Sequence, residues 1–193
     1  YYYMKFKAAV IQLNSDSNKI ANLAKVEKFI VEASQQQAKF IALPEVFNLR
    51  GTEAASNAED INTGESIQLI EKLAHANQVW ILAGSLMTQA SEKANLPHNT
   101  SLLISPEGKI TATYKKIHLF DMLQGTTQIR ESDRNQSGTS PQIARLSIND
   151  VEMKLGMSIC YDLRFAYLYR SLAQSGAQIL SVPSAFTVPT GQA

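Results

Sequence analysis

The sequence predicts an α/β fold with a mixed sheet, built as packed layers of strands and helices. Short apolar segments alternate with segments whose apolar residues recur at helical spacing, a pattern typical of βαβ units. Further along, pairs of apolar segments are joined by short turns, which predicts antiparallel hairpins. We therefore expect a sheet that contains both parallel and antiparallel neighbours and is covered by helices.

The first strand–helix unit lies near the start of the chain. Residues 6–13 form a short apolar segment suited to a buried strand. The polar residues 14–18 supply a turn and an N-cap for a helix. The apolar face expected on this helix consists of Ile20, Leu23, Val26, Ile30 and Ala33.

A second strand–helix–strand unit follows. Residues 40–43 are expected to form a buried strand, which Pro44 ends. After a polar loop, Gly64 and Glu65 open a helix with a regular apolar face. A strand over residues 79–87 completes the unit.

The first expected hairpin lies in the middle of the chain. Strands over 99–105 and 110–114 flank residues 106–109, where proline and glycine favour a tight turn. His98 follows Pro97 and is expected in the preceding loop.

The second expected hairpin leads into the last helix. Strands over 142–148 and 151–159 flank an Asn-Asp turn. A helix over about 165–175 then ends at Gly176, a typical C-cap residue, and residues 177–183 form one more strand.

Composition favours one domain covering residues 1–193. The chain is 45% hydrophobic, and its 18 basic and 17 acidic residues are scattered, which argues against a nucleic-acid-binding surface. No segment reaches the about 18 apolar residues that span a bilayer, and the start lacks a signal-peptide pattern. A lone cysteine fits a reducing compartment, so a cytoplasmic protein is expected. Met4 is typical of an initiator, so residues 1–4 are interpreted as a cloning scar or a disordered start.

Cys160 is the only cysteine and lies where a strand runs into the start of a helix. The backbone N–H groups that open a helix favour negative charge, so this position favours a thiolate nucleophile. The alternative is a buried structural cysteine that packs as a small hydrophobe.

Two other side chains make the nucleophile interpretation stronger. Glu45 directly follows Leu43-Pro44, and Lys116 lies in a segment that ends an apolar strand. A thiolate that attacks an amide carbonyl needs a base, a donor for the oxyanion and an acid for the leaving amine. Glu45, Lys116 and Cys160 supply groups of these kinds. No Cys pair or His-x-x-x-His spacing indicates a metal site, and no cofactor is expected.

Four motifs together resemble the nitrilase superfamily, the carbon–nitrogen hydrolases. They are Leu43-Pro44-Glu45, Tyr114-Lys115-Lys116-Ile117-His118-Leu119-Phe120, Gly156-Met157-Ser158-Ile159-Cys160-Tyr161-Asp162-Leu163-Arg164-Phe165 and Pro183-Ser184-Ala185-Phe186. The context of the cysteine, and Thr190-Gly191 after Ala185-Phe186, are most similar to the amidase branch that contains omega-amidase and deaminated glutathione amidase.

The resemblance implies a four-layer αββα sandwich with mixed sheets. It also implies a Glu45–Lys116–Cys160 triad and a homodimer or higher homo-oligomer. Family members continue beyond the last motif seen here, so the domain is interpreted as truncated at residue 193, without its C-terminal third.

Further site residues follow from matching the motifs position by position. Glu131 matches a second family glutamate; the alternative is an ordinary loop carboxylate. The Tyr161 backbone N–H is expected to share the oxyanion with Lys116, and Tyr161 and Phe186 either wall the pocket or pack in the core. Arg164 either binds a substrate carboxylate or pairs with a carboxylate such as Asp162 as a structural strut. His118 either supports the site or is a hydrogen-bonded core histidine.

The function that the resemblance implies is amide hydrolysis. The expected substrate is a small carboxylic acid with a terminal carboxamide, converted to the acid and ammonia through a cysteine thioester. Hydrolysis of a carbamoyl or nitrile substrate, or acyl transfer by the same triad, remains open. A non-catalytic assembly subunit is the third alternative if the chain is truly truncated.

Overall fold

A five-stranded mixed sheet forms the centre of the structure. The computed structural model describes residues 5–51, 53–90, 96–124 and 127–186. The strands lie in the order β1-β2-β3-β4-β5, with the first three parallel and the last two antiparallel to their neighbours. Their bounds are β1 (Ala8–Val10), β2 (Phe40–Ala42), β3 (Trp80–Thr88), β4 (His98–Ile104) and β5 (Ile110–Lys115).

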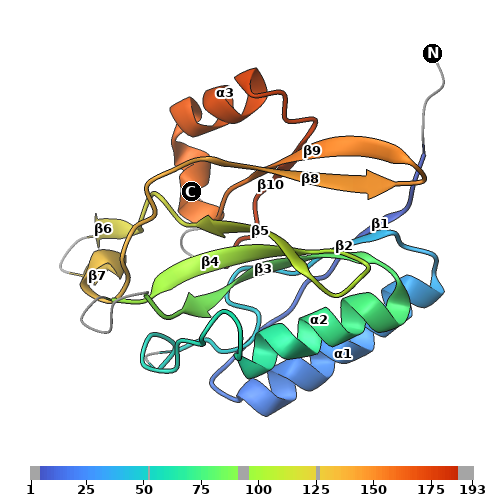
Figure 1. Cartoon of the computed structure of the whole chain (residues 1–193). Coiled ribbons are helices and arrows are strands. Elements are labelled where there is room, and N and C mark those ends of the chain that lie inside the picture. Colours follow the sequence, from blue (N-terminus) through green and yellow to red (C-terminus); the bar gives the residue numbers. More distant parts are fainter. Residues whose placement is uncertain (1–4, 52, 91–95, 125–126, 187–193) are drawn as a thin grey trace.

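Two helices, α1 (Lys19–Gln35) and α2 (Glu65–Asn77), lie side by side on one face of this sheet (Figure 1). Asn18 caps α1 by accepting a hydrogen bond from the Ala21 N–H, as its polar turn predicts. The apolar face expected of α1 is right except at its first residue, because Ile20 is 80% exposed. Ile20 lies in the first helical turn, where Asn22 instead takes the buried position and donates to the Asp16 and Asn48 carbonyls.

A smaller mixed sheet packs on the other side. It contains β10 (Ile179–Ser181), β9 (Val151–Met157) and β8 (Gln142–Ile148) in that order. The helix α3 (Ala166–Gln174) lies on its outer side (Figure 1), with Leu168 and Leu172 buried. A Cβ at Gly156 on β9 would lie 3.2 Å from the Leu172 Cβ, so glycine allows the helix to pack closely.

Two hydrophobic cores result from this arrangement. One lies between the five-stranded sheet and the helices α1 and α2. The second lies between the two sheets and includes Leu103 and Tyr114 from one and Leu146 and Leu155 from the other. The expected α/β class with mixed sheets is therefore present, and alternate residues of β3 face the two cores: Ile81 and Ala83 face one and Leu82 the other.

Further features differ from the sequence prediction. The first strand was expected to be buried over residues 6–13, but β1 covers only Ala8–Val10 and Val10 is 87% exposed. The segment after β5 contains a hairpin, β6 (Asp121–Gln124) and β7 (Thr127–Arg130). The sequence did not predict this hairpin, because the segment is rich in polar residues and lacks the apolar alternation of a buried strand. His98 was expected in a loop but is the first residue of β4, where it is buried and its Nδ1 bonds the Gln136 carbonyl.

Two interpretations concern segments outside the described residues. These are the start over residues 1–4 and the Thr190-Gly191 part of the last motif. Among the helices that the structure does describe, none has the length and apolar character needed to cross a membrane.

Candidate active site

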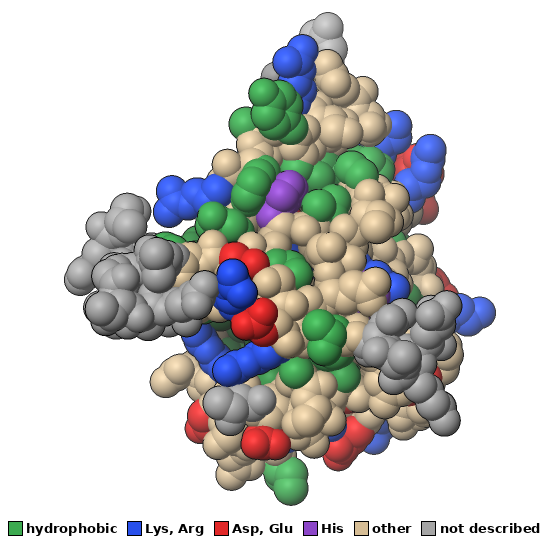
Figure 2. Space-filling view, turned by 90° about the vertical axis from the view of Figure 1, so that its left-hand side faces the viewer, with side chains coloured by type: hydrophobic (Ala, Val, Ile, Leu, Met, Phe, Trp, Pro, Cys, Tyr) green, Lys and Arg blue, Asp and Glu red, His purple; other side chains and the backbone are tan. Residues whose placement is uncertain are grey.

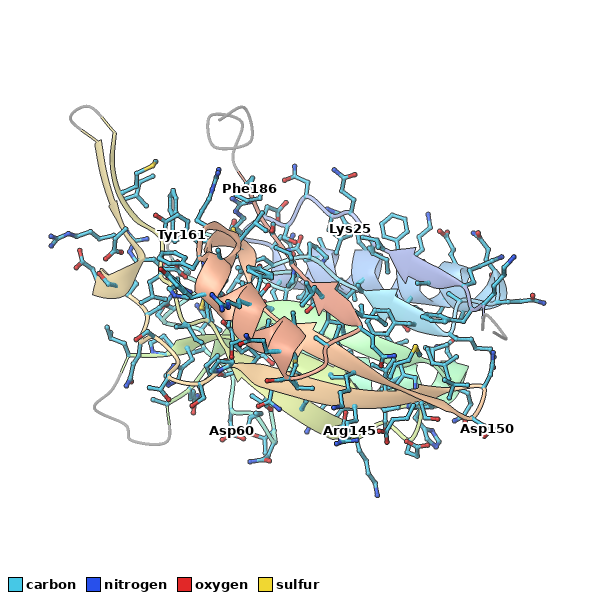
Figure 3. The ribbon with its side chains drawn as sticks, turned by 90° about the horizontal axis from the view of Figure 1, so that it is seen from above. Lys25, Asp60, Arg145, Asp150, Tyr161 and Phe186 are labelled. Atoms are coloured by element: carbon cyan, nitrogen blue, oxygen red, sulfur yellow. The ribbon has the colours of Figure 1, made fainter. Side chains whose placement is uncertain are left out.

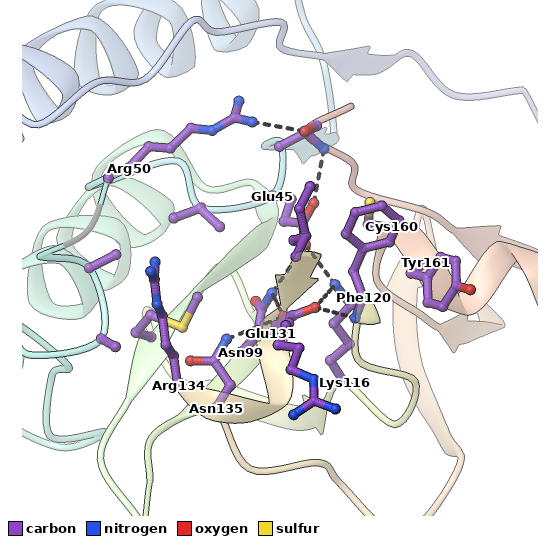
Figure 4. Close-up of a pocket in the computed structure, with 18 of the residues that line it drawn as sticks. Glu45, Arg50, Asn99, Lys116, Phe120, Glu131, Arg134, Asn135, Cys160 and Tyr161 are labelled. Atoms are coloured by element: carbon purple, nitrogen blue, oxygen red, sulfur yellow. Dashed lines mark hydrogen bonds and ion pairs between the residues drawn. The ribbon is translucent and has the colours of Figure 1, made fainter. Parts of the chain in front are cut away.

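Four loops that follow strands bring the predicted polar residues to one pocket. Glu45 follows β2, Lys116 follows β5, and Glu131 begins a short 3-10 helix, η1 (Glu131–Asp133), after β7. Cys160 begins a second one, η2 (Cys160–Arg164), after β9. All four line a pocket of about 500 Å³ (Figure 4). The site lies at the end of the molecule that carries Tyr161 and Phe186, far from the β8–β9 turn at Asp150 (Figure 3).

Lys116 joins two carboxylates in this pocket. Its Nζ lies 3.2 Å from Glu45 Oε1 and 2.9 Å from Glu131 Oε2. The Lys116 side chain is only 2% exposed, so water screens these ion pairs weakly. Burial by itself would lower the pKa of Lys116, but the two carboxylates outweigh burial and raise this pKa above its ordinary value. Lys116 is therefore a fixed cation.

Backbone and amide groups complete the coordination of the two glutamates. The Ala185 N–H donates to Glu45 Oε2 at 2.9 Å, and the Phe120 N–H donates to Glu131 Oε2 at 2.7 Å. Asn99 donates to Glu45 Oε1, and Asn135 donates to Glu131 Oε1 at 3.2 Å. Several donors therefore fix the orientation of both carboxylates.

Cys160 adopts a left-handed backbone conformation, with a φ of 46°. Such a conformation is uncommon outside glycine and places a side chain on a sharp strand-to-helix turn. The Cys160 N–H donates to the Pro183 carbonyl at 2.9 Å, which ties this turn to the end of β10. The nucleophile candidate is thus held by both neighbouring strands of the small sheet.

The protonation state expected for Cys160 is wrong. Burial, together with the nearby negative charge of Glu45, raises the pKa of Cys160 to about 12. Lys116 and the Ala185 N–H act in the opposite direction but do not outweigh these two effects. The following 3-10 helix is too short to favour the thiolate strongly. At neutral pH the resting group is therefore a thiol, beside a carboxylate that can take its proton.

Asp162 stabilises the turn that carries Cys160 through hydrogen bonds to its side chain. It is fully buried and accepts hydrogen bonds from the Ile159 N–H at 2.9 Å and from the Tyr114 hydroxyl at 2.7 Å. His118 Nδ1 lies 2.7 Å from Asp162 Oδ1, and its ring stacks on Phe165 at 3.7 Å. His118 thus supports the turn and is outside the described pocket lining.

Neither role considered for Arg164 is seen among the described residues. Arg164 is exposed and is absent from the described lining of the pocket. No ion pair with Asp162 occurs among the described residues, because Asp162 is enclosed by Tyr114, His118 and Ile159. The 3-10 geometry of η2 turns Arg164 to the surface.

Comparison with known proteins decides the family. The carbon–nitrogen hydrolase family model matches residues 7–193. The chain belongs to the carbon–nitrogen hydrolase family. It is 36% identical over 190 residues to the omega-amidase NIT2 of Pongo abelii, covering 97% of this chain and 66% of that protein. It is 37% identical over 191 residues to a deaminated glutathione amidase of Synechocystis, covering 97% of this chain and 69% of that protein.

Solved structures agree with this assignment. The NitFhit protein of C. elegans superimposes with a TM-score of 0.83 at 33% identity, covering 96% of this chain and 45% of that chain. The expected resemblance to the nitrilase superfamily and its amidase branch is confirmed, as is an α/β fold of nitrilase type with mixed sheets. The chain spans about two thirds of the length of the curated relatives named above.

The walls of the pocket combine aromatic and cationic side chains. Tyr161 and Phe186 lie in the pocket lining, as one of the two alternatives expected, and Phe120 meets Tyr161 edge to face at 5.0 Å. Three arginines also line the pocket, and none was singled out from the sequence: Arg50, Arg130 and Arg134. The only signal for them was their position near Glu45 and Glu131 along the chain.

Charges of both signs are interspersed on the face of the molecule near the hairpin β6–β7 (Figure 2). Within the described ranges, no group of three or more His, Cys, Asp or Glu side chains is arranged to hold a metal ion.

Proposed function

We propose that this chain carries the reacting groups of a thiol-dependent amidase. The reaction would convert a terminal carboxamide to the acid and ammonia. The observation that carries the proposal is the bridge from Lys116 to both Glu45 and Glu131 beside the Cys160 thiol. Membership of the carbon–nitrogen hydrolase family and similarity to proteins named as amidases agree with it.

In the first step, Cys160 Sγ forms a bond to the carbonyl carbon while Glu45 takes the thiol proton. The raised pKa of Cys160 makes this transfer necessary, because little thiolate exists beforehand at neutral pH. The carbonyl oxygen gains negative charge in the tetrahedral intermediate. Lys116 has three hydrogens and uses two on the glutamates, so the third is available for this oxyanion. The backbone N–H of Tyr161 is the second proposed donor.

In the second step, the C–N bond breaks and Glu45 returns its proton to the leaving nitrogen. Ammonia departs, and the acyl group remains on Cys160 as a thioester. Glu45 then removes a proton from water, which attacks the thioester carbon and releases the carboxylic acid and the thiol. Glu131 keeps Lys116 in place and exchanges no proton, since its two oxygens already accept from Lys116, Phe120 and Asn135.

The proposed substrate is a small carboxylic acid that carries the amide at its far end. Arg134 extends into the open part of the pocket (Figure 4), and Arg130 also belongs to the lining. A guanidinium binds a carboxylate through two parallel hydrogen bonds, which orients the ligand as well as holding it. Arg50 is occupied otherwise, because its Nη2 donates to the Ala185 carbonyl at 3.0 Å.

For the whole protein, we propose the four-layer αββα sandwich of the family, a homo-oligomer and a cytoplasmic location. The two sheets and the helices on their outer sides support the layered arrangement. Sedimentation of the purified protein tests the oligomer directly.

The activity is tested by measuring ammonia release from a panel of amides. The panel pairs each acid amide that bears a distal carboxylate with a neutral amide of equal length. Turnover of the carboxylate-bearing amides supports the proposal, whereas a protein that releases no ammonia from any member contradicts it. Nitriles and carbamoyl compounds in the same panel separate the alternative substrates.

A further inference from the structure

Asn99 is fixed in the site by a rigid element. It is the second residue of β4, which is hydrogen-bonded between β3 and β5, and it is only 1% exposed. The Asn99 carbonyl accepts a hydrogen bond from the Lys116 N–H at 2.9 Å, so the backbones of these two residues are joined. The reaction steps described above give Asn99 no task, although it lines the pocket.

The Asn99 amide contacts both glutamates. Its Nδ2 lies 3.1 Å from Glu45 Oε1 and 3.5 Å from Glu131 Oε1. An amide nitrogen carries two hydrogens, so one is available for each carboxylate. The opposite orientation of the amide would put Oδ1 against two carboxylate oxygens, which excludes it electrostatically. The Asn99 amide therefore bridges Glu45 and Glu131, the same two side chains that Lys116 bridges (Figure 4).

The charges around Asn99 explain why a neutral donor suits this position. Glu45 and Glu131 carry two negative charges, and Lys116 supplies one positive charge, while the Cys160 thiol is neutral at rest. The two carboxylates therefore repel each other with only one cation between them. Asn99 donates a hydrogen bond to each carboxylate and leaves the net charge of the group unchanged.

We infer that Asn99 is a positioning residue that holds the carboxylate of Glu45 against Lys116 and aimed at the Cys160 thiol. The inference rests on the proposed function, in which Glu45 is the base. Among the described residues, Glu45 has three donors, from Lys116, Asn99 and the Ala185 N–H. Loss of Asn99 removes one of them. Glu131 keeps three other donors when Asn99 is lost, so the consequence falls mainly on the base.

The kinetic test compares Asn99→Ala with Ser101→Ala, both normalised to the folded fraction measured by circular dichroism. Ser101 lies two residues along β4 on the same face, is buried, and has no hydrogen bond from its hydroxyl to any described residue. Asn99→Ala is expected to lower kcat about 10- to 100-fold, the effect of one charge-assisted hydrogen bond, with little change in KM. Ser101→Ala is expected to leave both constants unchanged. Equal kcat in the two variants overturns the inference.

A second measurement needs no substrate and so separates this inference from the amidase proposal. The Tm values of Asn99→Ala, Glu45→Gln and the double variant form a thermodynamic cycle. If Asn99 holds Glu45, the decrease in Tm of the double variant is smaller than the sum of the decreases in the two single variants. A strictly additive decrease in Tm overturns the inference. Should the wild type hydrolyse no amide, the amidase proposal fails while this cycle still decides about Asn99. If Asn99→Ala does not fold, Asn99→Ser, which keeps a polar side chain at this buried position, replaces it in both measurements with the same outcomes expected.

Discussion

Lys116 Nζ lies 3.2 Å from Glu45 Oε1, although 71 positions separate the two residues in the sequence. Glu45 follows a strand near one edge of the five-stranded sheet and Lys116 follows the strand at the other edge, so the loops beyond these strands must converge. Burying an ammonium is unfavourable unless it is paired. The geometry therefore stabilises Lys116 as a cation where an oxyanion would form.

We expect Cys160→Ala to abolish ammonia release without unfolding the protein. Alanine removes the only thiol in the chain, so no thioester forms, and turnover falls at least about 10³-fold. The Cys160 turn is held by Pro183 and Asp162 through backbone groups that alanine keeps. Ammonia assays and circular dichroism check both parts. Retained turnover in a folded Cys160→Ala variant would exclude the thiol mechanism.

The sequence was sufficient for those site residues that lie in recognisable motifs. Glu45, Lys116, Cys160 and Glu131 were all expected in one site, and the structure places all four in one pocket. Mixed sheets were also expected from strand–helix units followed by hairpins, whereas the strand order is known only from the structure.

Residues that act through tertiary contacts could not be found in this way. Asn99 lies inside a strand whose periodicity is explained by burial alone, and its two carboxylate partners are 54 and 32 positions away. Arg134 follows a hairpin that the sequence did not predict. The thiolate expected at Cys160 was wrong because local position suggested a helix N-terminus, whereas burial and Glu45 dominate.

We expect Glu45→Gln to lower the pKa of Cys160 and at the same time to lower the rate of ammonia release. The carboxylate contributes, after burial, to the raised pKa of Cys160 of about 12, so its removal shifts the midpoint of alkylation to lower pH. The thiolate forms more readily, yet ammonia release falls about 10²–10⁴-fold because the base and acid are lost. Iodoacetamide labelling against pH reports on Cys160 alone, since no other cysteine is present.

The matched control is Glu32→Gln, a carboxylate on the exposed side of α1. It is expected to change neither the labelling midpoint nor the turnover. An unchanged midpoint in Glu45→Gln would mean that Glu45 and the Cys160 sulfur do not interact.

We expect Lys116→Met to reduce stability as well as activity. It leaves two carboxylates without their shared cation, and removal of one partner of a buried pair costs about 3–5 kcal/mol. Because the folded-state pKa of Lys116 is raised, its contribution is full below the ordinary lysine pKa of about 10.4 and is lost only as pH rises through the raised value. Urea unfolding of both proteins at pH 7 and pH 9 should therefore give the same difference. A difference that shrinks between these pH values would contradict the buried ion pair.

We expect Arg134→Gln to raise KM for amides that carry a distal carboxylate. The guanidinium lies in the pocket lining and extends toward the open space beside Glu131 (Figure 4), so its loss removes a charge-assisted contact worth about 10- to 100-fold in binding. Neutral amides of the same length lack the partner for that contact, so their kinetics should change little. Arg164→Gln is the matched control, because Arg164 is exposed and outside the described pocket lining. An equal rise in KM for anionic and neutral amides would show that Arg134 shapes the pocket but does not bind the substrate carboxylate.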